Sequence, residues 1–134
     1  MAGESILIVD DNAANLKLAR VILTSEGYPV RTAGDAEEAL AAVRDYMPAL
    51  ILMDIQIPGM DGLELTRRLK ADPKTRGIAI LALTAYAMKG DEERMLAAGC
   101  DGYVAKPIDR QRLIEQIAEL ITRSKARHTE RVPE

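Results

Sequence analysis

The sequence contains one cysteine and one histidine among its 134 residues. Cys100 has no partner for an internal disulfide, so we expect a reduced protein in which this side chain is a small buried group beside a helix end. His128 stands alone near the C-terminus, which argues against a Zn²⁺ site and against a histidine-based nucleophile relay. The sequence thus gives no support for chemistry at a thiol or an imidazole.

Long apolar runs and an excess of basic residues are also lacking. No run approaches the roughly 20 apolar residues that span a bilayer, and the N-terminal MAGES has neither a basic segment nor an apolar stretch of signal-peptide length. The net charge is -3, from 18 basic and 21 acidic residues, whereas a nucleic-acid backbone is bound by a basic patch or stripe. We expect a cytoplasmic protein that binds neither membranes nor nucleic acid directly.

The sequence does contain four short apolar runs that each end on a reactive polar residue. The runs SILIV, LILM, ILAL and YVA are followed by Asp10 and Asp11, Asp54, Thr84 and Lys106, respectively. If these runs are buried parallel strands, their carboxyl ends meet at one edge of a sheet, where open α/β folds place their sites. Three carboxylates, a hydroxyl and an ammonium would then share a pocket. Such oxygen donors suit a hard cation such as Mg²⁺, and with a lysine beside them they indicate phosphate chemistry.

The whole chain alternates between short β-branched or leucine-rich runs and helical patterns, which predicts an α/β fold with a five-stranded parallel sheet. Strands are expected at residues 5–9, 30–33, 49–53, 78–83 and 102–105. Helices are expected at about 12–26, from a capping box at Asp35 and Glu38 to Pro48, from a turn at 58–62 to about residue 72, at 89–98 and after Asp109. One domain over residues 4–123 accounts for all of these elements.

Two segments are expected to be less ordered. The helix at 89–98 has Gly90 near its start and little apolar face, which predicts mobility. From Ser124 the apolar periodicity is lost, so residues 124–134 are expected to form a disordered C-terminal tail.

The motifs VDDN, LMDIQIPGMDG, LALTA and AKPI, in this order and spacing, resemble a receiver domain of a two-component response regulator over residues 4–123. The stretch TAYAMKGDEERMLAAGCDGY further resembles single-domain regulators of the DivK type. This resemblance implies the flavodoxin-like receiver fold, a doubly wound (βα)5 sheet. It also implies a phosphorelay protein that accepts a phosphoryl group from a histidine kinase or a histidine phosphotransfer protein and then switches its protein-protein interactions.

The resemblance assigns an acceptor and a metal site to matching positions. Asp54 matches the phosphoacceptor, whose carboxylate attacks the phosphorus of a phosphohistidine. Asp10 and Asp11 match the acidic pair that holds Mg²⁺, with Mn²⁺ as a substitute, together with Asp54 and the backbone carbonyl of Gln56. Lys106 matches the lysine that pairs with the phosphoryl group, and the bond to the proline after it is usually cis in this family.

A switch is implied as well. Thr84 matches the hydroxyl that hydrogen-bonds the new phosphoryl oxygen, and Tyr103 matches the aromatic residue that turns into the space vacated when the loop after Thr84 moves inward. The changed surface would be the face of the fourth helix, the fifth strand and the last helix, where a downstream protein would bind. The chain would be a monomer or a phosphorylation-dependent dimer.

No enzymatic turnover is expected beyond self-phosphorylation from small donors and autodephosphorylation. In this family the residues two positions beyond the acceptor and beyond the threonine, here Gln56 and Tyr86, influence how fast water removes the phosphoryl group.

Two other functions use similar elements. A phosphatase of the haloacid dehalogenase type also uses an aspartyl phosphate and Mg²⁺, but it needs a second Asp where this chain has Gln56. A flavodoxin-like cofactor binder needs a Gly- or Ser/Thr-rich phosphate loop after its first strand, where Asp10 and Asp11 would repel phosphate. Each site residue also has a purely structural interpretation, such as helix capping by the first acidic pair. Their joint arrangement at four strand ends favours a site.

Overall fold

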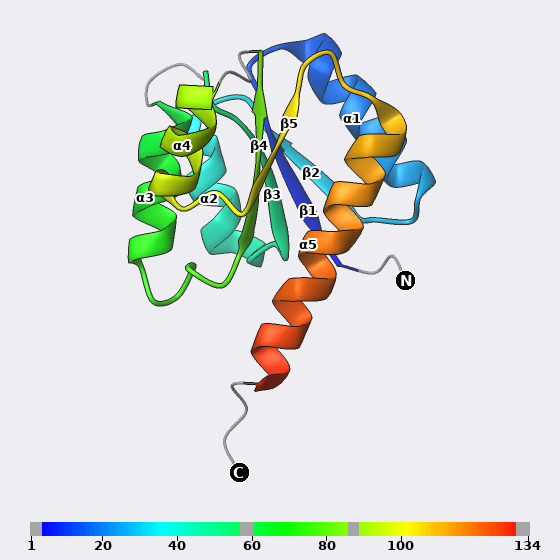
Figure 1. Cartoon of the computed structure of the whole chain (residues 1–134). Helices are drawn as coiled ribbons and strands as arrows, with labels where there is room; N and C mark the ends of the chain where they lie inside the picture. The colour runs from blue at the N-terminus through cyan, green and yellow to red at the C-terminus, as the bar shows by residue number, and fades with distance from the viewer. Residues whose placement is uncertain (1–3, 57–60, 86–88, 131–134) are drawn as a thin grey trace.

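In the computed structural model, which describes residues 4–56, 61–85 and 89–130, five parallel strands form one sheet with helices on both faces (Figure 1). The strands are β1 (Ile6–Val9), β2 (Val30–Ala33), β3 (Leu50–Asp54), β4 (Ala79–Thr84) and β5 (Gly102–Ala105). The helices are α1 (Ala13–Ser25), α2 (Ala36–Tyr46), α3 (Gly62–Ala71), α4 (Lys89–Ala98) and α5 (Arg110–Glu130). The strand order is β2-β1-β3-β4-β5, which confirms the predicted doubly wound (βα)5 fold. None of the described helices is both long and apolar enough to cross a membrane.

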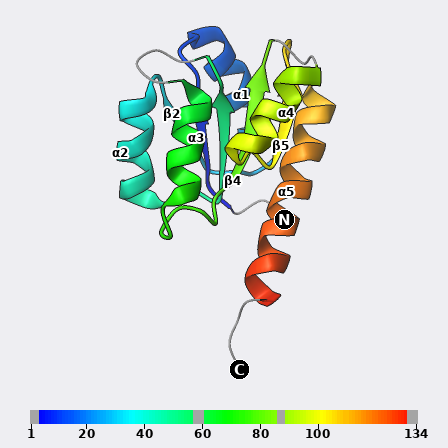
Figure 2. The ribbon, with the colours of Figure 1, turned by 60° about the vertical axis from the view of Figure 1, so that its left-hand side comes forward.

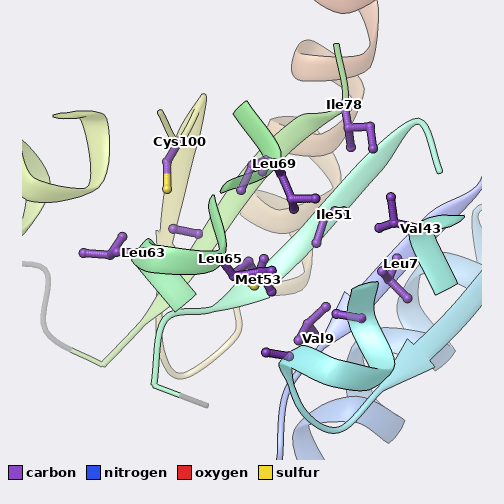
Figure 3. Close-up of a cluster of buried hydrophobic side chains, with 14 of the residues drawn as sticks. Leu7, Val9, Val43, Ile51, Met53, Leu63, Leu65, Leu69, Ile78 and Cys100 are labelled. Atoms are coloured by element: carbon purple, nitrogen blue, oxygen red, sulfur yellow. The ribbon is translucent and has the colours of Figure 1, made fainter. Parts of the chain in front are cut away.

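The sheet separates two apolar clusters, because successive side chains of a strand point to opposite faces. Leu7 and Val9 pack with α2, α3 and α4 in one cluster, whereas Ile6 and Ile8 pack with α1 and α5 in the other. Figure 2 shows the two helical layers, and Figure 3 shows the first cluster from close by. The three central strands β1, β3 and β4 are buried along their whole length, as expected for strands covered on both sides.

Local signals in the sequence set several of the helix ends. Asp35 accepts a hydrogen bond from the Glu38 N–H at 2.8 Å, while the Glu38 carboxylate accepts one from the Gly34 N–H at 3.0 Å, so the predicted capping box is confirmed. Gly27 and Gly99, with φ of 92° and 109°, follow α1 and α4 in backbone conformations that favour glycine. Only part of the predicted turn at 58–62 lies in the described residues.

Helix α5 is longer than its apolar pattern indicates. It continues to Glu130, so its residues 124–130 differ from the disordered tail that we expected there. The apolar stripe ends because this part of α5 extends past the sheet (Figure 1). A helix already begun on the sheet can continue through Lys, Ala and Arg, which are good helix formers, without further apolar contacts.

A hydrogen-bonded ion pair between Lys70 and Asp101 joins three segments of the chain at the amino end of the sheet. The Lys70 ammonium donates to the Asp101 carboxylate and to the carbonyl oxygen of Ile78, both at 2.9 Å. The same oxygen of Asp101 accepts the N–H of Ile80 at 2.8 Å. The Lys70 stem also lies against Gly99, where a Cβ would be 2.8 Å from the Lys70 Cγ. This Lys70–Asp101 clamp ties the end of α3 to the start of β4 and to the loop between α4 and β5.

We predict that Lys70→Met lowers the free energy of unfolding by about 2–3 kcal/mol, because it removes charge-assisted hydrogen bonds and leaves a largely buried carboxylate without its cation. Urea denaturation gives the measurement. The matched control is Arg68→Met, since Arg68 pairs with Glu64 at 3.5 Å but its side chain is 59% exposed, against 19% for Lys70. The control should lose less than about 1 kcal/mol. Equal losses in the two variants would contradict a structural role for the clamp.

Candidate functional site

Four strands deliver their terminal polar residues to one edge of the sheet. Asp10 follows β1, Asp54 ends β3, Thr84 ends β4 and Lys106 follows β5. The strands are paired so that Asp54 lies beside Leu83 of β4, and Thr84 lies beside Ala105 of β5. The backbone continues this pairing, since the Lys106 N–H donates to the Thr84 carbonyl at 2.7 Å. The predicted gathering of these residues is therefore observed.

Three carboxylates form the centre of the site. One oxygen from each of Asp10, Asp11 and Asp54 can be chosen so that all lie within 4.8 Å of one another. Asp10 and Asp54 are 0% and 2% exposed, whereas Asp11 is on the surface. In both buried residues the Oδ1 atom accepts the backbone N–H two residues further on, from Asn12 and from Gln56, at 2.9 Å. These local bonds fix the carboxylates and leave each Oδ2 for other contacts.

Lys106 brings a positive charge to this site. Its Nζ lies 3.2 Å from Asp54 Oδ2 and 4.0 Å from Asp10 Oδ2. The Lys106–Pro107 bond is cis, as the sequence resemblance implied. Three carboxylates and one ammonium leave a formal charge of -2 when all are ionised, which is the charge that a divalent cation would balance.

Burial disfavours the charged form of the Asp10 carboxylate. Burial raises the pKa of Asp10 above its ordinary value, and the Asp54 charge adds to the rise, while the Asn12 N–H and Lys106 oppose it. Asp10 Oδ2 is also buried with no hydrogen-bond partner within the described part of the chain. A buried carboxylate oxygen without a hydrogen-bond partner is a suitable ligand for a metal cation. The donors are all oxygen, so Mg²⁺ or Mn²⁺ fits better than a soft metal.

The two predicted switch residues lie on the same face of the sheet. Thr84 is 1% exposed, and its strand neighbour Ala82 shares this face and pairs with Tyr103 of β5. Tyr103 is half-buried, and its hydroxyl donates to the Glu92 carboxylate of α4 at 3.1 Å. This hydrogen bond and the Glu92 charge raise the pKa of Tyr103. No feature of the sequence indicated Glu92, and Tyr86 lies outside the described residues.

The comparison with known proteins agrees with this geometry. A family model described as the response regulator receiver domain matches residues 6–118. The chain is 47% identical over 114 residues to the polar-differentiation response regulator DivK of Brucella anthropi, covering 85% of this chain and 93% of the relative. The resemblance predicted from the sequence, including the DivK type, is thereby confirmed.

Solved structures with the same fold include a CheY-like receiver domain protein from Methanospirillum hungatei. It aligns with a TM-score of 0.86 and 34% identity, over 94% of this chain and 99% of the other. The receiver domain of the sensor histidine kinase PA1611 from Pseudomonas aeruginosa aligns with a TM-score of 0.82 and 37% identity, over 90% and 99% of the two chains. That structure is described with a magnesium ion coordinated in its active site cleft.

We predict that Asp10→Asn raises the free energy of unfolding of the metal-free protein at neutral pH. Since the native pKa of Asp10 lies above its ordinary value of 3.8, the native state binds this proton more readily than the unfolded chain does. The contribution of Asp10 to stability therefore falls as the pH rises from that value through the raised pKa. The gain in the variant should be larger at neutral pH than at pH 3.8 and should shrink as the pH is lowered. Urea denaturation in EDTA at a series of pH values gives the measurement.

The matched control is Asp72→Asn, because Asp72 also accepts the N–H two residues on, from Lys74 at 2.9 Å, but is exposed. No comparable gain is expected for this control. A variant Asp10→Asn that is less stable than the parent at neutral pH would mean that attraction to Lys106 outweighs the burial of the carboxylate.

Proposed function

The chain belongs to the response regulator receiver domain family, and on this premise we propose that Asp54 accepts a phosphoryl group from a phosphohistidine and thereby switches the binding of other proteins. The observation that carries the assignment of Asp54 is its position: a nearly buried carboxylate, 3.2 Å from the Lys106 ammonium, between two further aspartates. Asp10 is also buried in this cluster, but its Oδ2 is 4.0 Å from the Lys106 ammonium, so Asp54 is the nearer of the two buried carboxylates to that charge.

Asp54 is the proposed nucleophile. One of its carboxylate oxygens forms a bond to phosphorus, the bond from phosphorus to the donor imidazole breaks, and its electron pair returns to the ring. The Gln56 N–H holds Oδ1 at 2.9 Å and so limits rotation of the carboxylate before attack. Lys106 is already within ion-pair distance of Oδ2, and we propose that its ammonium then pairs with the transferred phosphoryl group as a point charge.

We propose that Asp10, Asp11, Asp54 and the backbone carbonyl of Gln56 hold Mg²⁺, for which Mn²⁺ can substitute. The buried, unbonded Oδ2 of Asp10 and the all-oxygen donor set support this assignment. When bound, the cation neutralises charge on the equatorial phosphoryl oxygens. Asp10 is fixed by the Asn12 N–H, while the exposed Asp11 is free of the packing that holds the other two.

Thr84 and Tyr103 are the proposed switch. A hydrogen bond from the Thr84 hydroxyl to the new phosphoryl oxygen would draw the end of β4 toward Asp54. Tyr103 lies on the same face of the sheet, and its bond to Glu92 connects it to α4. We propose that a change at Thr84 reaches α4 by this route and alters the face of α4, β5 and α5 for a downstream protein.

The proposed donors are a histidine kinase or a histidine phosphotransfer protein, and the proposed location is the cytoplasm, as the family implies. Self-phosphorylation from small donors and autodephosphorylation are the reactions that we assign to Asp54. A monomer or a phosphorylation-dependent dimer is expected. The haloacid dehalogenase and flavodoxin alternatives are set aside, because the receiver family model covers residues 6–118.

Intact-mass analysis after incubation with acetyl phosphate and Mg²⁺ should show one added phosphoryl group on the parent and none on Asp54→Asn. The reason is that Asp54 is the buried carboxylate nearer to Lys106, at 3.2 Å against 4.0 Å for Asp10, and has the acidic pair beside it. Asp11→Asn serves as the companion variant: it keeps the acceptor but removes a proposed metal ligand, so it should be labelled more slowly. Labelling of Asp54→Asn to the extent of the parent would show that the acceptor lies elsewhere.

Thr84→Ala should still be phosphorylated but should not pass the change on to α4. Beryllofluoride with Mg²⁺ imitates the phosphoryl group, and amide NMR shifts follow its effect. In the parent the shifts should extend from Asp54 to Tyr103 and α4, whereas in Thr84→Ala they should stay near Asp54. Thr24→Ala, at an exposed position near the end of α1, is the control and should behave as the parent. The same wide pattern in Thr84→Ala would rule out the proposed route.

A further inference from the structure

We propose that Gly62 is a positioning residue for the phosphorylation site, because the absence of a Cβ lets α3 begin against the backbone that carries Asp54. The inference rests on the function proposed for Asp54. A Cβ on Gly62 would lie 2.6 Å from the Ile55 Cα and 2.7 Å from the Asp54 carbonyl oxygen. Both are backbone atoms, so no change of side-chain rotamer relieves the contact. The backbone itself would have to move.

The requirement at Gly62 is for space and not for an unusual backbone conformation. Gly27 and Gly99 have positive φ, whereas Gly62 does not. Its neighbours also differ from those of Gly77, where a Cβ would meet no atom within 4 Å. In the first turn of a helix, alanine is otherwise at least as favourable as glycine. A harmful effect of alanine at position 62 would therefore arise from the close approach.

Helix α3 is held firmly on its side of this contact. Leu63, Leu65 and Leu69 are buried in the cluster that packs on the sheet (Figure 3). The Thr66 hydroxyl donates to the Gly62 carbonyl at 2.9 Å in a buried hydrogen bond. Withdrawal of α3 would open a gap under these leucines, which close-packed interiors resist.

The backbone on the other side is held less firmly. Ile55 is half-buried and Gln56 is exposed, and the Ile55 N–H reaches the Leu83 carbonyl at 3.3 Å, a longer distance than most of the other backbone bonds. We therefore infer that a methyl group at position 62 displaces Ile55 and Gln56 and not α3. This segment supplies the N–H that orients Asp54 and the carbonyl proposed to face Mg²⁺.

The expected result is a protein that folds but binds Mg²⁺ poorly. Displacing a group that orients metal ligands typically weakens affinity by about tenfold or more. Amide NMR shifts of Gly62→Ala without metal should differ from the parent mainly at Asp54, Ile55 and Gln56. Titration with Mg²⁺, followed by the same shifts, should give a dissociation constant about tenfold or more above that of the parent. Gly77→Ala is the matched control and should retain the affinity of the parent.

Several outcomes would overturn the inference. One is a folded Gly62→Ala with parental Mg²⁺ affinity, and another is a set of shifts that runs along α3 to Leu69 while Ile55 and Gln56 keep their parental values. If the variant is unfolded in buffer, the comparison is made for all proteins in trimethylamine N-oxide, which favours compact states. Failure to fold there as well would mean that the whole domain, and not the site, depends on Gly62.

If the proposed function of Asp54 is wrong, the results for the parent protein differ from those described above. In that case the parent itself would bind no Mg²⁺ and would take up no phosphoryl group. The metal-free amide shifts of Gly62→Ala against Gly77→Ala would still show whether the close approach positions Asp54.

Discussion

Asp10 and Asp54 are buried at the carboxyl edge of the sheet, and Lys106 is the described ammonium within 4.0 Å of both. Isolated carboxylates are rarely buried, because desolvation strongly disfavours their charged form. Here each of the two receives one backbone N–H, and Lys106 lies nearer to one than to the other. The three clustered carboxylates therefore lack a full balance of positive charge, which is the charge that the proposed Mg²⁺ would supply.

The sequence predicted this edge because strand termini are simple to recognise. Three central strands are buried on both faces, so they appear as unbroken apolar runs, and the first polar residue after such a run marks the carboxyl end. Helix caps were predicted equally well where a side chain bonds to its own neighbours, as at Asp35. These signals are local, and each can be read from fewer than about ten residues.

What the sequence did not predict depends on contacts between distant elements. The bond from Tyr103 to Glu92 joins a strand to a helix whose own pattern is weak, and neither residue indicates the other. In the sequence Gly62 resembles an ordinary turn residue. The sequence does not distinguish a glycine that is required for space from one that is required for a positive φ. The length of α5 was underestimated because an apolar stripe reports packing, whereas a helix can extend beyond the surface on which it packs.

The Lys70–Asp101 clamp has a mechanical consequence for α4. It fixes the chain around Gly99, directly after the last residue of α4, while the bond from Glu92 to Tyr103 lies in the first half of the same helix. A helix of 10 residues is about 15 Å long. Because the C-terminal end of α4 is fixed, a lateral displacement of Glu92 rotates the helix about Gly99. The displacement of each α4 residue then grows with its distance from Gly99. A movement of Tyr103 that is passed to Glu92 would therefore displace the N-terminal end of α4 most.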